Sequence, residues 1–191
     1  MTRRSAEPGE PRQPNAPSQP SKPSPPREPI EAREPRAGYA ENAAPQAVPA
    51  RALLDVNVLI ALLDADHLHH RRATAWLAQN IAAGWASCAI TQNGCVRIMS
   101  QPGYPNPLPT ARVAERLRAA TLTAHHQFVS GDTSLLDAEH FDTEQLLGHR
   151  QVTDAYLLGL AVAHRLRLVT FDANVPLRVV RGAKAGHVVA L

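Results

Sequence analysis

The sequence predicts an α/β protein, a three-layer α/β/α sandwich built on a central, mainly parallel sheet. Two observations lead to this fold class. From about Val48 to Leu191, short apolar runs of strand length alternate with longer runs of helix length, which is the order that a parallel sheet with covering helices requires. The connections between these runs are short, and right-handed crossovers over short connections place helices on both faces of a sheet.

The first 48 residues differ from the remainder of the chain. They contain most of its 17 prolines, mixed with Arg, Glu, Ser and Gln, and they have few large apolar side chains. A segment of this kind buries too little apolar surface to offset the entropy that a chain loses on folding. We therefore predict a disordered, partly polyproline tail over residues 1–48 and a single folded domain over residues 49–191.

Composition and charge limit the location and the partners. The tail has no apolar stretch of the length found in secretory signals, and no segment reaches the roughly 18 apolar residues that span a membrane. We expect a cytoplasmic protein without membrane contact. The net charge of +3 permits contact with nucleic acid without requiring it. The two cysteines, Cys88 and Cys95, stand at a spacing that fits neither a zinc site nor a redox pair.

The domain begins with a predicted strand, two helices and a second strand. Residues 51–55 are a short apolar run that ends in an aspartate, and the apolar run 56–63 after it has the length of a helix. Residues 70–83 carry apolar side chains at helical spacing and precede Gly84, which suits a helix C-cap. The short apolar run 85–88 predicts the second strand.

The middle of the domain predicts two helices and a short strand. A helix is expected to open at Thr91 and run to residue 99, and another is expected over residues 110–121. The proline-rich run 101–109 separates them, because proline interrupts a helix. Residues 127–129 have the apolar character of a strand. Residues 135–147 show no clear period, and the sequence leaves open whether they hold short helical turns.

The C-terminal third predicts a helix between two strands of the same sheet. Residues 152–165 are apolar on two faces, which is typical of a helix buried between the sheet and other elements. Residues 167–170 and 187–190 are short apolar runs that predict strands. The helix and strands continue the alternation on which the fold class rests.

Three aspartates that lie far apart in the chain occupy similar places in these elements. Asp55 and Asp172 stand at the carboxyl ends of predicted strands, and ligands bind at that edge of open α/β sheets. Asp154 follows Thr153, which we predict to be a helix N-cap, and the helix dipole at such a place favours an ionised carboxylate. The three carboxylates are thus expected to converge on one crevice.

Three carboxylates in one crevice imply a cation. Fixed carboxylates about 4 Å apart repel by about 4 kcal/mol at an effective dielectric constant near 20, so a bound cation is needed to neutralise them. A single aspartate at such a place is more often a turn or cap residue. Three of them together favour a metal site formed by Asp55, Asp154 and Asp172.

The strings that contain these aspartates closely resemble the PIN domain family of VapC-type toxin ribonucleases. They are residues 55–60 (DVNVLI), 152–155 (VTDA) and 170–174 (TFDAN). The resemblance extends over residues 51–191. It also includes Asp66, His67, His70 and Trp76 after the first helix, and residues 90–94 (ITQNG) with Arg97, which resemble the family's second-acid motif.

The resemblance implies an activity, a cofactor and partners. The activity is metal-dependent endoribonuclease cleavage of RNA phosphodiester bonds by the toxin of a VapBC-type toxin–antitoxin pair. Asp55, Asp154 and Asp172 would bind one or two Mg²⁺ or Mn²⁺ ions, which lower the pKa of a bound water and stabilise negative charge on phosphorus. The implied partners are a structured RNA with exposed single strands, a cognate VapB-type antitoxin and a second copy of the chain in a homodimer.

The resemblance gives supporting roles to four further residues. Asn57 and Thr170 would support the carboxylates by hydrogen bonds, Asn174 would border the site, and Arg97 would stand near its mouth and meet RNA or an inhibitor. For the first three, a turn or cap role is an equal alternative. For Arg97, the alternative is a plain exposed arginine on a helix.

Gln92 is the main departure from the family pattern, because family members of this type usually carry Glu at this place. Glutamine has nearly the shape of glutamate, but its neutral amide offers only one weak oxygen to a hard cation. No Asp or Glu lies between Asp66 and Glu115 to replace it. A second hypothesis is therefore a catalytically weakened or silent PIN module that binds RNA or an antitoxin.

Two other chemistries are weaker alternatives. His67 and His70 have a His-x-x-His spacing, but the sequence specifies no third or fourth ligand for zinc. A phosphatase or receiver domain could use Asp55 as nucleophile or phosphoacceptor. The haloacid dehalogenase type of phosphatase needs a second Asp where Asn57 stands, and a receiver needs a Lys near a late strand, whereas the domain has only Lys184.

Overall fold

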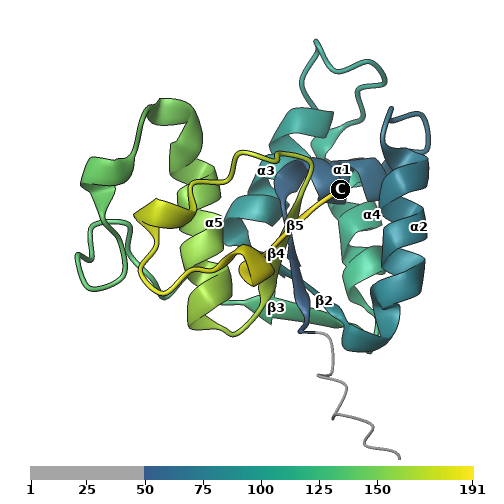
Figure 1. The fold of residues 1–191 in the computed structure, drawn as a ribbon. Coiled ribbons are helices and arrows are strands. Elements are labelled where there is room, and N and C mark those ends of the chain that lie inside the picture. Colours follow the sequence, from purple (N-terminus) through teal and green to yellow (C-terminus); the bar gives the residue numbers. More distant parts are fainter. Residues whose placement is uncertain (1–49) are drawn as a thin grey trace, which may run out of the picture. The chain divides into compact units, whose positions relative to one another are not determined.

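The computed structural model describes residues 50–191, and the predicted tail over residues 1–48 lies outside the described residues. A five-stranded sheet forms the centre of this domain (Figure 1). All of its strands pair in parallel, in the order β3-β2-β1-β4-β5. The strands are β1 (Ala52–Leu54), β2 (Trp85–Cys88), β3 (His126–Val129), β4 (Arg167–Thr170) and β5 (Val188–Ala190).

Helices cover both faces of the sheet, which confirms the predicted α/β/α sandwich. One face is covered by α1 (Val56–Leu63), α3 (Ala89–Met99) and α4 (Thr110–Thr121), with α2 (His70–Asn80) packed against them. The other face is covered by α5 (Val152–Ala163). Within the described part of the chain, no helix is long and apolar enough to cross a membrane.

The alternation of side chains along β1 explains why both faces need a cover. Leu53 is fully buried in the core beneath α5, whereas Ala52 and Leu54 are buried in the core beneath α1 and α3. Successive side chains of a strand point to opposite faces, so a strand that is apolar at every position must be covered on both. The continuous apolar run of β1 therefore places it at the centre of the sheet.

Several predicted boundaries move by one or two residues. The predicted strands 127–129 and 187–190 are observed as β3 and β5, and the helix predicted over residues 152–165 ends at Ala163. The helix predicted to open at Thr91 begins two residues earlier, at Ala89, because the Thr91 hydroxyl accepts the N–H of Cys88 and donates to its carbonyl. Thr91 thus caps the helix from its first turn.

The predicted N-cap of α5 is wrong. Thr153 is the second residue of the helix and makes no capping hydrogen bond, and Gln151 is the residue at the N-cap position. The reason is a short 3-10 turn, His149–Gln151, that runs directly into α5. Because the chain is already helical before Val152, no extended residue remains to act as the cap. Asp154 is still in the first turn, where the helix dipole favours a negative charge.

The strand order creates a topological switch point beside β1. The chain proceeds from β1 to β2 and β3 on one side, and then returns to place β4 and β5 on the other side. In such sheets the connections after β1 and β4 leave in opposite directions and open a crevice at the carboxyl ends of the strands. The residues that follow Leu54 and Thr170 therefore lie at the place where ligands bind in this kind of fold.

Candidate active site

Asp55 occupies the switch point directly after β1. Its backbone N–H donates to Val169 O of β4 at 2.9 Å, which extends the pairing of the two strands by one residue. Its side chain caps α1, because Oδ1 accepts the N–H of Val56 at 2.6 Å. The residue is only 7% exposed, so its carboxylate is fixed from both sides in a nearly buried position.

Thr170 links Asp55 to Asp172 across the end of β4. Its hydroxyl donates to Oδ2 of Asp55 at 3.2 Å and accepts the backbone N–H of Asp172 at 3.1 Å. Thr170 is itself buried, at 2% exposed. Asp172 is exposed, and its Oδ1 accepts the N–H of Asn174 at 2.7 Å in an Asx turn. This chain of hydrogen bonds sets the position of one aspartate relative to the other.

Asp154 lies on the first turn of α5, the helix that covers the face of the sheet opposite to α1. It shares a cavity of about 560 Å³ with Asp55. The helices α1 and α3 and the turn that leads into α5 form the remainder of this cavity. Its lining residues are Asp55, Val56, Asn57, Ile90, Asn93, Gly94, Arg97, Ile98, Arg150, Thr153 and Asp154.

The acidic groups influence one another's ionisation. Burial is the main factor that raises the pKa of Asp55, the charge of Asp172 raises it further, and hydrogen bonds from Val56, Thr170 and Asn57 oppose the rise. The pKa of Asp154 rises to about 6, first because of burial and then because of the charges of Asp55 and Asp172. Carboxylates that raise one another's pKa in a crevice would gain from a cation between them.

The donor set suits a hard cation that keeps part of its water shell. Among residues 50–191, no three Asp, Glu, His or Cys side chains lie close enough to form a complete cage for an ion. Mg²⁺ is usually held by one or two carboxylates, with waters and substrate phosphates as the other ligands. Asp55 and Asp154 on one cavity, with Asp172 near both, meet this requirement.

One face of α3 lines the cavity, and Gln92 is not on it. The lining residues on α3 are Ile90, Asn93, Gly94, Arg97 and Ile98, which follow helical spacing. The Gln92 amide instead donates to Ser87 Oγ at 2.9 Å and borders a separate cavity between α3 and α4. Gln92 thus lines a cavity next to the acidic one, and Asn93 lines both.

Close packing of two helices fixes this face of α3. A Cβ atom added at Gly94 would stand 2.9 Å from a methyl group of Val56, so only glycine lets α3 approach the start of α1 this closely. The contact lies one residue from Asp55. The rotation of α3 at this contact places Arg97 on the acidic cavity, Gln92 on the neighbouring cavity and Asn93 on both.

The other predicted site residues fall into different places. Asn57 and Arg97 line the acidic cavity. Asn174 closes the turn through its backbone N–H, and its side chain is not among the cavity residues. Arg150 and Asn93 also line the cavity, but the sequence analysis missed them. Arg150 lies one turn before Asp154, which is the signal that could have indicated it.

The histidines after α1 have structural partners. His70 Nδ1 lies 2.7 Å from the carbonyl oxygen of Ala61, which ties the start of α2 to α1. The ring of His69 stands 4.5 Å from that of Phe171, and His67 stacks on the same ring at 6.4 Å. These contacts fix the α1–α2 turn against the loop that carries Asp172.

The chain belongs to the PIN domain family, whose model matches residues 52–181. It is 55% identical over 141 residues to ribonuclease VapC44 of Mycobacterium tuberculosis, covering 74% of this chain and 99% of that protein. It is 43% identical over 125 residues to ribonuclease VapC38 of the same organism, covering 65% of this chain and 86% of that protein.

Among solved structures, the chain is similar to the crystal structure of Mycobacterium tuberculosis VapC20, a toxin that cleaves the sarcin-ricin loop. The TM-score is 0.47 and the identity is 12%, covering 68% of this chain and 98% of that one. Membership of the family thus rests on the sequence matches.

Proposed function

We propose that this chain is a metal-dependent endoribonuclease, the toxin of a VapBC-type toxin–antitoxin pair, with its active site at Asp55, Asp154 and Asp172. The observation that carries the proposal is the cavity shared by Asp55 and Asp154 at the switch point of a PIN-domain sheet. The ribonuclease names of relatives that are 55% and 43% identical support the activity.

The residues of the site would prepare an RNA phosphate for hydrolysis. Thr170 and the Val56 N–H hold the Asp55 carboxylate in one orientation, which leaves its remaining lone pairs for an Mg²⁺ or Mn²⁺ ion. When bound, the cation supplies positive charge that stabilises the negative charge developing on phosphorus, and it makes a water molecule more acidic. Asn57 and Asn93 offer amide groups on the walls of the cavity for the sugar and phosphate oxygens.

The carboxylates of Asp55 and Asp154 repel each other, but the surrounding structure holds both of them in place. Asp55 is preorganised by two hydrogen bonds and a helix start, and Asp154 by the first turn of α5. Neither group must move to meet an ion or a phosphate, so little reorganisation energy opposes the reaction. The hydrolysis itself forms a bond from a water oxygen to phosphorus and breaks the bond from phosphorus to the leaving ribose oxygen.

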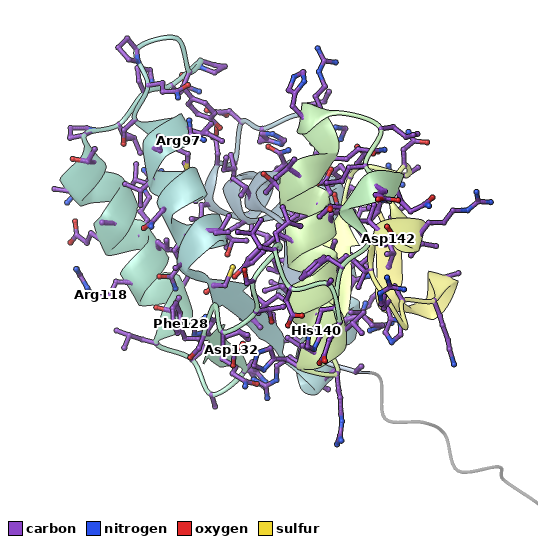
Figure 2. All side chains as sticks on the ribbon, turned by 90° about the vertical axis from the view of Figure 1, so that its left-hand side faces the viewer. Arg97, Arg118, Phe128, Asp132, His140 and Asp142 are labelled. Atoms are coloured by element: carbon purple, nitrogen blue, oxygen red, sulfur yellow. The ribbon has the colours of Figure 1, made fainter. Side chains whose placement is uncertain are left out.

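Cleavage of total RNA by the purified full chain tests the proposal. We expect cleavage with Mg²⁺ or Mn²⁺ and none with EDTA. Asp55→Asn should reduce the rate by a factor of at least about 100, because it removes a charged ligand that is held in place. Asp132→Asn is the matched control, because Asp132 lies well below Arg97 in Figure 2 and bonds to His164 at the end of α5 opposite Asp154. Equal rates for the native chain and Asp55→Asn would reject the proposal.

The silent-module alternative rests on Gln92, and the geometry gives it less support than the sequence did. Because Gln92 borders a different cavity, a glutamate there would not join Asp55 and Asp154. We expect Gln92→Glu to change the cleavage rate by less than about threefold, since it adds no ligand to the site. If the native chain is inactive and Gln92→Glu cleaves RNA, the silent module is the correct function.

We further propose a cognate antitoxin and a homodimer as partners. An antitoxin would inhibit by covering the mouth of the acidic cavity, where Arg97 stands exposed. Co-expression with the product of the neighbouring gene, followed by size-exclusion chromatography with light scattering, measures both properties. The expected result is a complex that contains two copies of this chain and has no ribonuclease activity.

A further inference from the structure

The acidic cavity carries two arginines that form no ion pair with an acidic side chain of residues 50–191. Arg97 reaches it from α3, and Arg150 reaches it from the turn before α5. The ion pairs among residues 50–191 are Arg112–Glu115, His140–Asp137 and His164–Asp132. Both guanidinium groups thus border a site of carboxylates without pairing with any of them.

Arg150 also borders a second cavity. This cavity, of about 370 Å³, is formed by a short run of chain directly before α5. Its lining residues are Leu147, Gly148, His149, Arg150 and Gln151. Because Arg150 lines both cavities, the second one is adjacent to the acidic cavity.

The chemistry of the second cavity differs from that of the first. It contains no carboxylate, and its walls offer Arg150, the His149 ring and the apolar side chain of Leu147, which is 89% exposed. A guanidinium binds a phosphate through two parallel hydrogen bonds, and apolar and ring surfaces accept an unstacked base. A nucleotide that follows a phosphate at the acidic cavity would meet both kinds of group here.

A firm scaffold holds the lining of the second cavity. The side-chain oxygen of Gln151 accepts the N–H of Leu147 at 3.0 Å, which closes the loop on itself. The 3-10 turn His149–Gln151 then continues into α5, the helix that carries Asp154. The position of Arg150 relative to Asp154 is therefore fixed by one rigid element.

We propose that Arg150 and the cavity at residues 147–151 form a subsite for the nucleotide next to the scissile phosphate of a single-stranded RNA. The proposal rests on the proposed function of the acidic cavity, because it assigns the path of the RNA away from that cavity. Arg150 is a positioning residue that binds the flanking phosphate. His149 and Leu147 contact the adjoining base without selecting its sequence.

Binding of RNA without cleavage tests the subsite. The probe is a fluorescein-labelled single-stranded RNA 20-mer of mixed sequence, measured by fluorescence anisotropy against the full chain carrying Asp55→Asn. Adding Arg150→Ala should weaken binding by about tenfold, since one charged hydrogen-bond pair is lost. It should also reduce the slope of log Kd against log salt by about 0.7, the contribution of one phosphate on a single strand.

Two further variants separate a phosphate contact from a general change in charge. Arg116→Ala removes an exposed arginine on α4 that lines neither cavity, so affinity and salt slope should stay within about twofold of the parent. Arg150→Lys keeps the charge but loses the two parallel hydrogen bonds, so it should restore the salt slope and only part of the lost affinity. In the chain with an intact Asp55, Arg150→Ala should raise KM and change kcat by less than about threefold.

The outcomes distinguish the subsite from the active site. If Asp55→Asn abolishes cleavage but Arg150→Ala binds RNA with the parent's affinity and salt slope, the subsite is rejected and the proposed function stands. Equal losses for Arg116→Ala and Arg150→Ala would also reject it. If Asp55→Asn cleaves RNA at the native rate, the acidic cavity is not the active site, and the subsite is rejected with it.

Discussion

At the scale of single residues, the site depends on the hydrogen bonds that hold its carboxylates as much as on the carboxylates themselves. Asp55 would be an ordinary helix cap if its only partner were the Val56 N–H. Its second oxygen is held by Thr170, a buried hydroxyl that also accepts the N–H of Asp172. One hydroxyl thus forms hydrogen bonds to both Asp55 and Asp172, the two aspartates that follow strands β1 and β4.

Replacing Thr170 by valine removes this hydroxyl but keeps the shape of the side chain. We expect Thr170→Val to raise the Mg²⁺ concentration needed for half-maximal cleavage by roughly 10-fold to 100-fold, the usual cost of losing a group that orients a metal ligand. Cleavage assays over an Mg²⁺ titration measure this shift. Thr170→Ser, which keeps the hydroxyl, should behave like the native chain, and an unchanged titration curve for Thr170→Val would contradict the assigned role.

The raised pKa of Asp154 makes the stability of the metal-free protein dependent on pH. Its value of about 6 lies above the ordinary value of 3.8. Between these pH values the folded state binds more protons than the unfolded state, so stability falls as pH rises through this window and stays lower above it. Because Asp154 is only partly buried, solvent screening reduces the effect to about 1 kcal/mol.

Asp154→Asn should remove this penalty. In EDTA at pH 7.5 we expect its Tm to exceed that of the native chain by about 2–4 °C, which corresponds to about 1 kcal/mol for a domain of this size. At pH 4 or below the two Tm values should converge, because Asp154 is then protonated. Thermal melts by circular dichroism at both pH values provide the measurement. A native chain that is the more stable one at pH 7.5 would show that Asp154 is not destabilised by its ionisation.

At the scale of elements, α5 connects the proposed active site to the core on the face of the sheet that this helix covers. Its first turn carries Asp154, and Gly159, five residues further along, faces the ring of Phe141. Phe141 is 2% exposed and comes from the segment that precedes α5. The absence of a side chain at Gly159 lets this ring lie directly on the helix.

Gly159→Ala should therefore destabilise the domain, although alanine is the better helix former. An exposed Gly→Ala change in a helix gains about 1 kcal/mol, but here the new methyl group would overlap the Phe141 ring, and overpacking costs about 1–3 kcal/mol. Urea unfolding gives the free energy. The control is Gly103→Ala, where no atom lies within 4 Å of the added carbon. A second change, Phe141→Leu, should make Gly159→Ala less harmful, and an unaltered effect would contradict the proposed clash.

At the scale of the whole molecule, the domain described over residues 50–191 has its own two-sided core. We propose that it folds without the proline-rich segment before it. Deletion of residues 1–47 should leave Tm within about 2 °C of the full chain, because the core formed by residues 50–191 begins at Ala52. Differential scanning calorimetry of both chains measures this. A large drop in Tm would show that the deleted segment contributes to the fold.

The sequence alone determined the order of the elements and the places of Asp55 and Asp172. These features are local, since an apolar run followed by a turn residue defines a strand end whatever surrounds it, and the carboxyl ends of parallel strands share one edge. The family motifs have the same local character. The prediction of a helix start at Thr153 was wrong because the true start depends on the conformation of the preceding turn.

Only the tertiary structure decided which side chains share the site. The contact of Gly94 with Val56 fixes the rotation of α3, so Asn93 and Arg97 face the acids while Gln92 turns to Ser87. The turn before α5 brings in Arg150, which lies between the elements that the sequence predicts. Both results depend on packing between segments far apart in the chain. The spacing of residues within one segment does not specify how that segment is rotated against its neighbours.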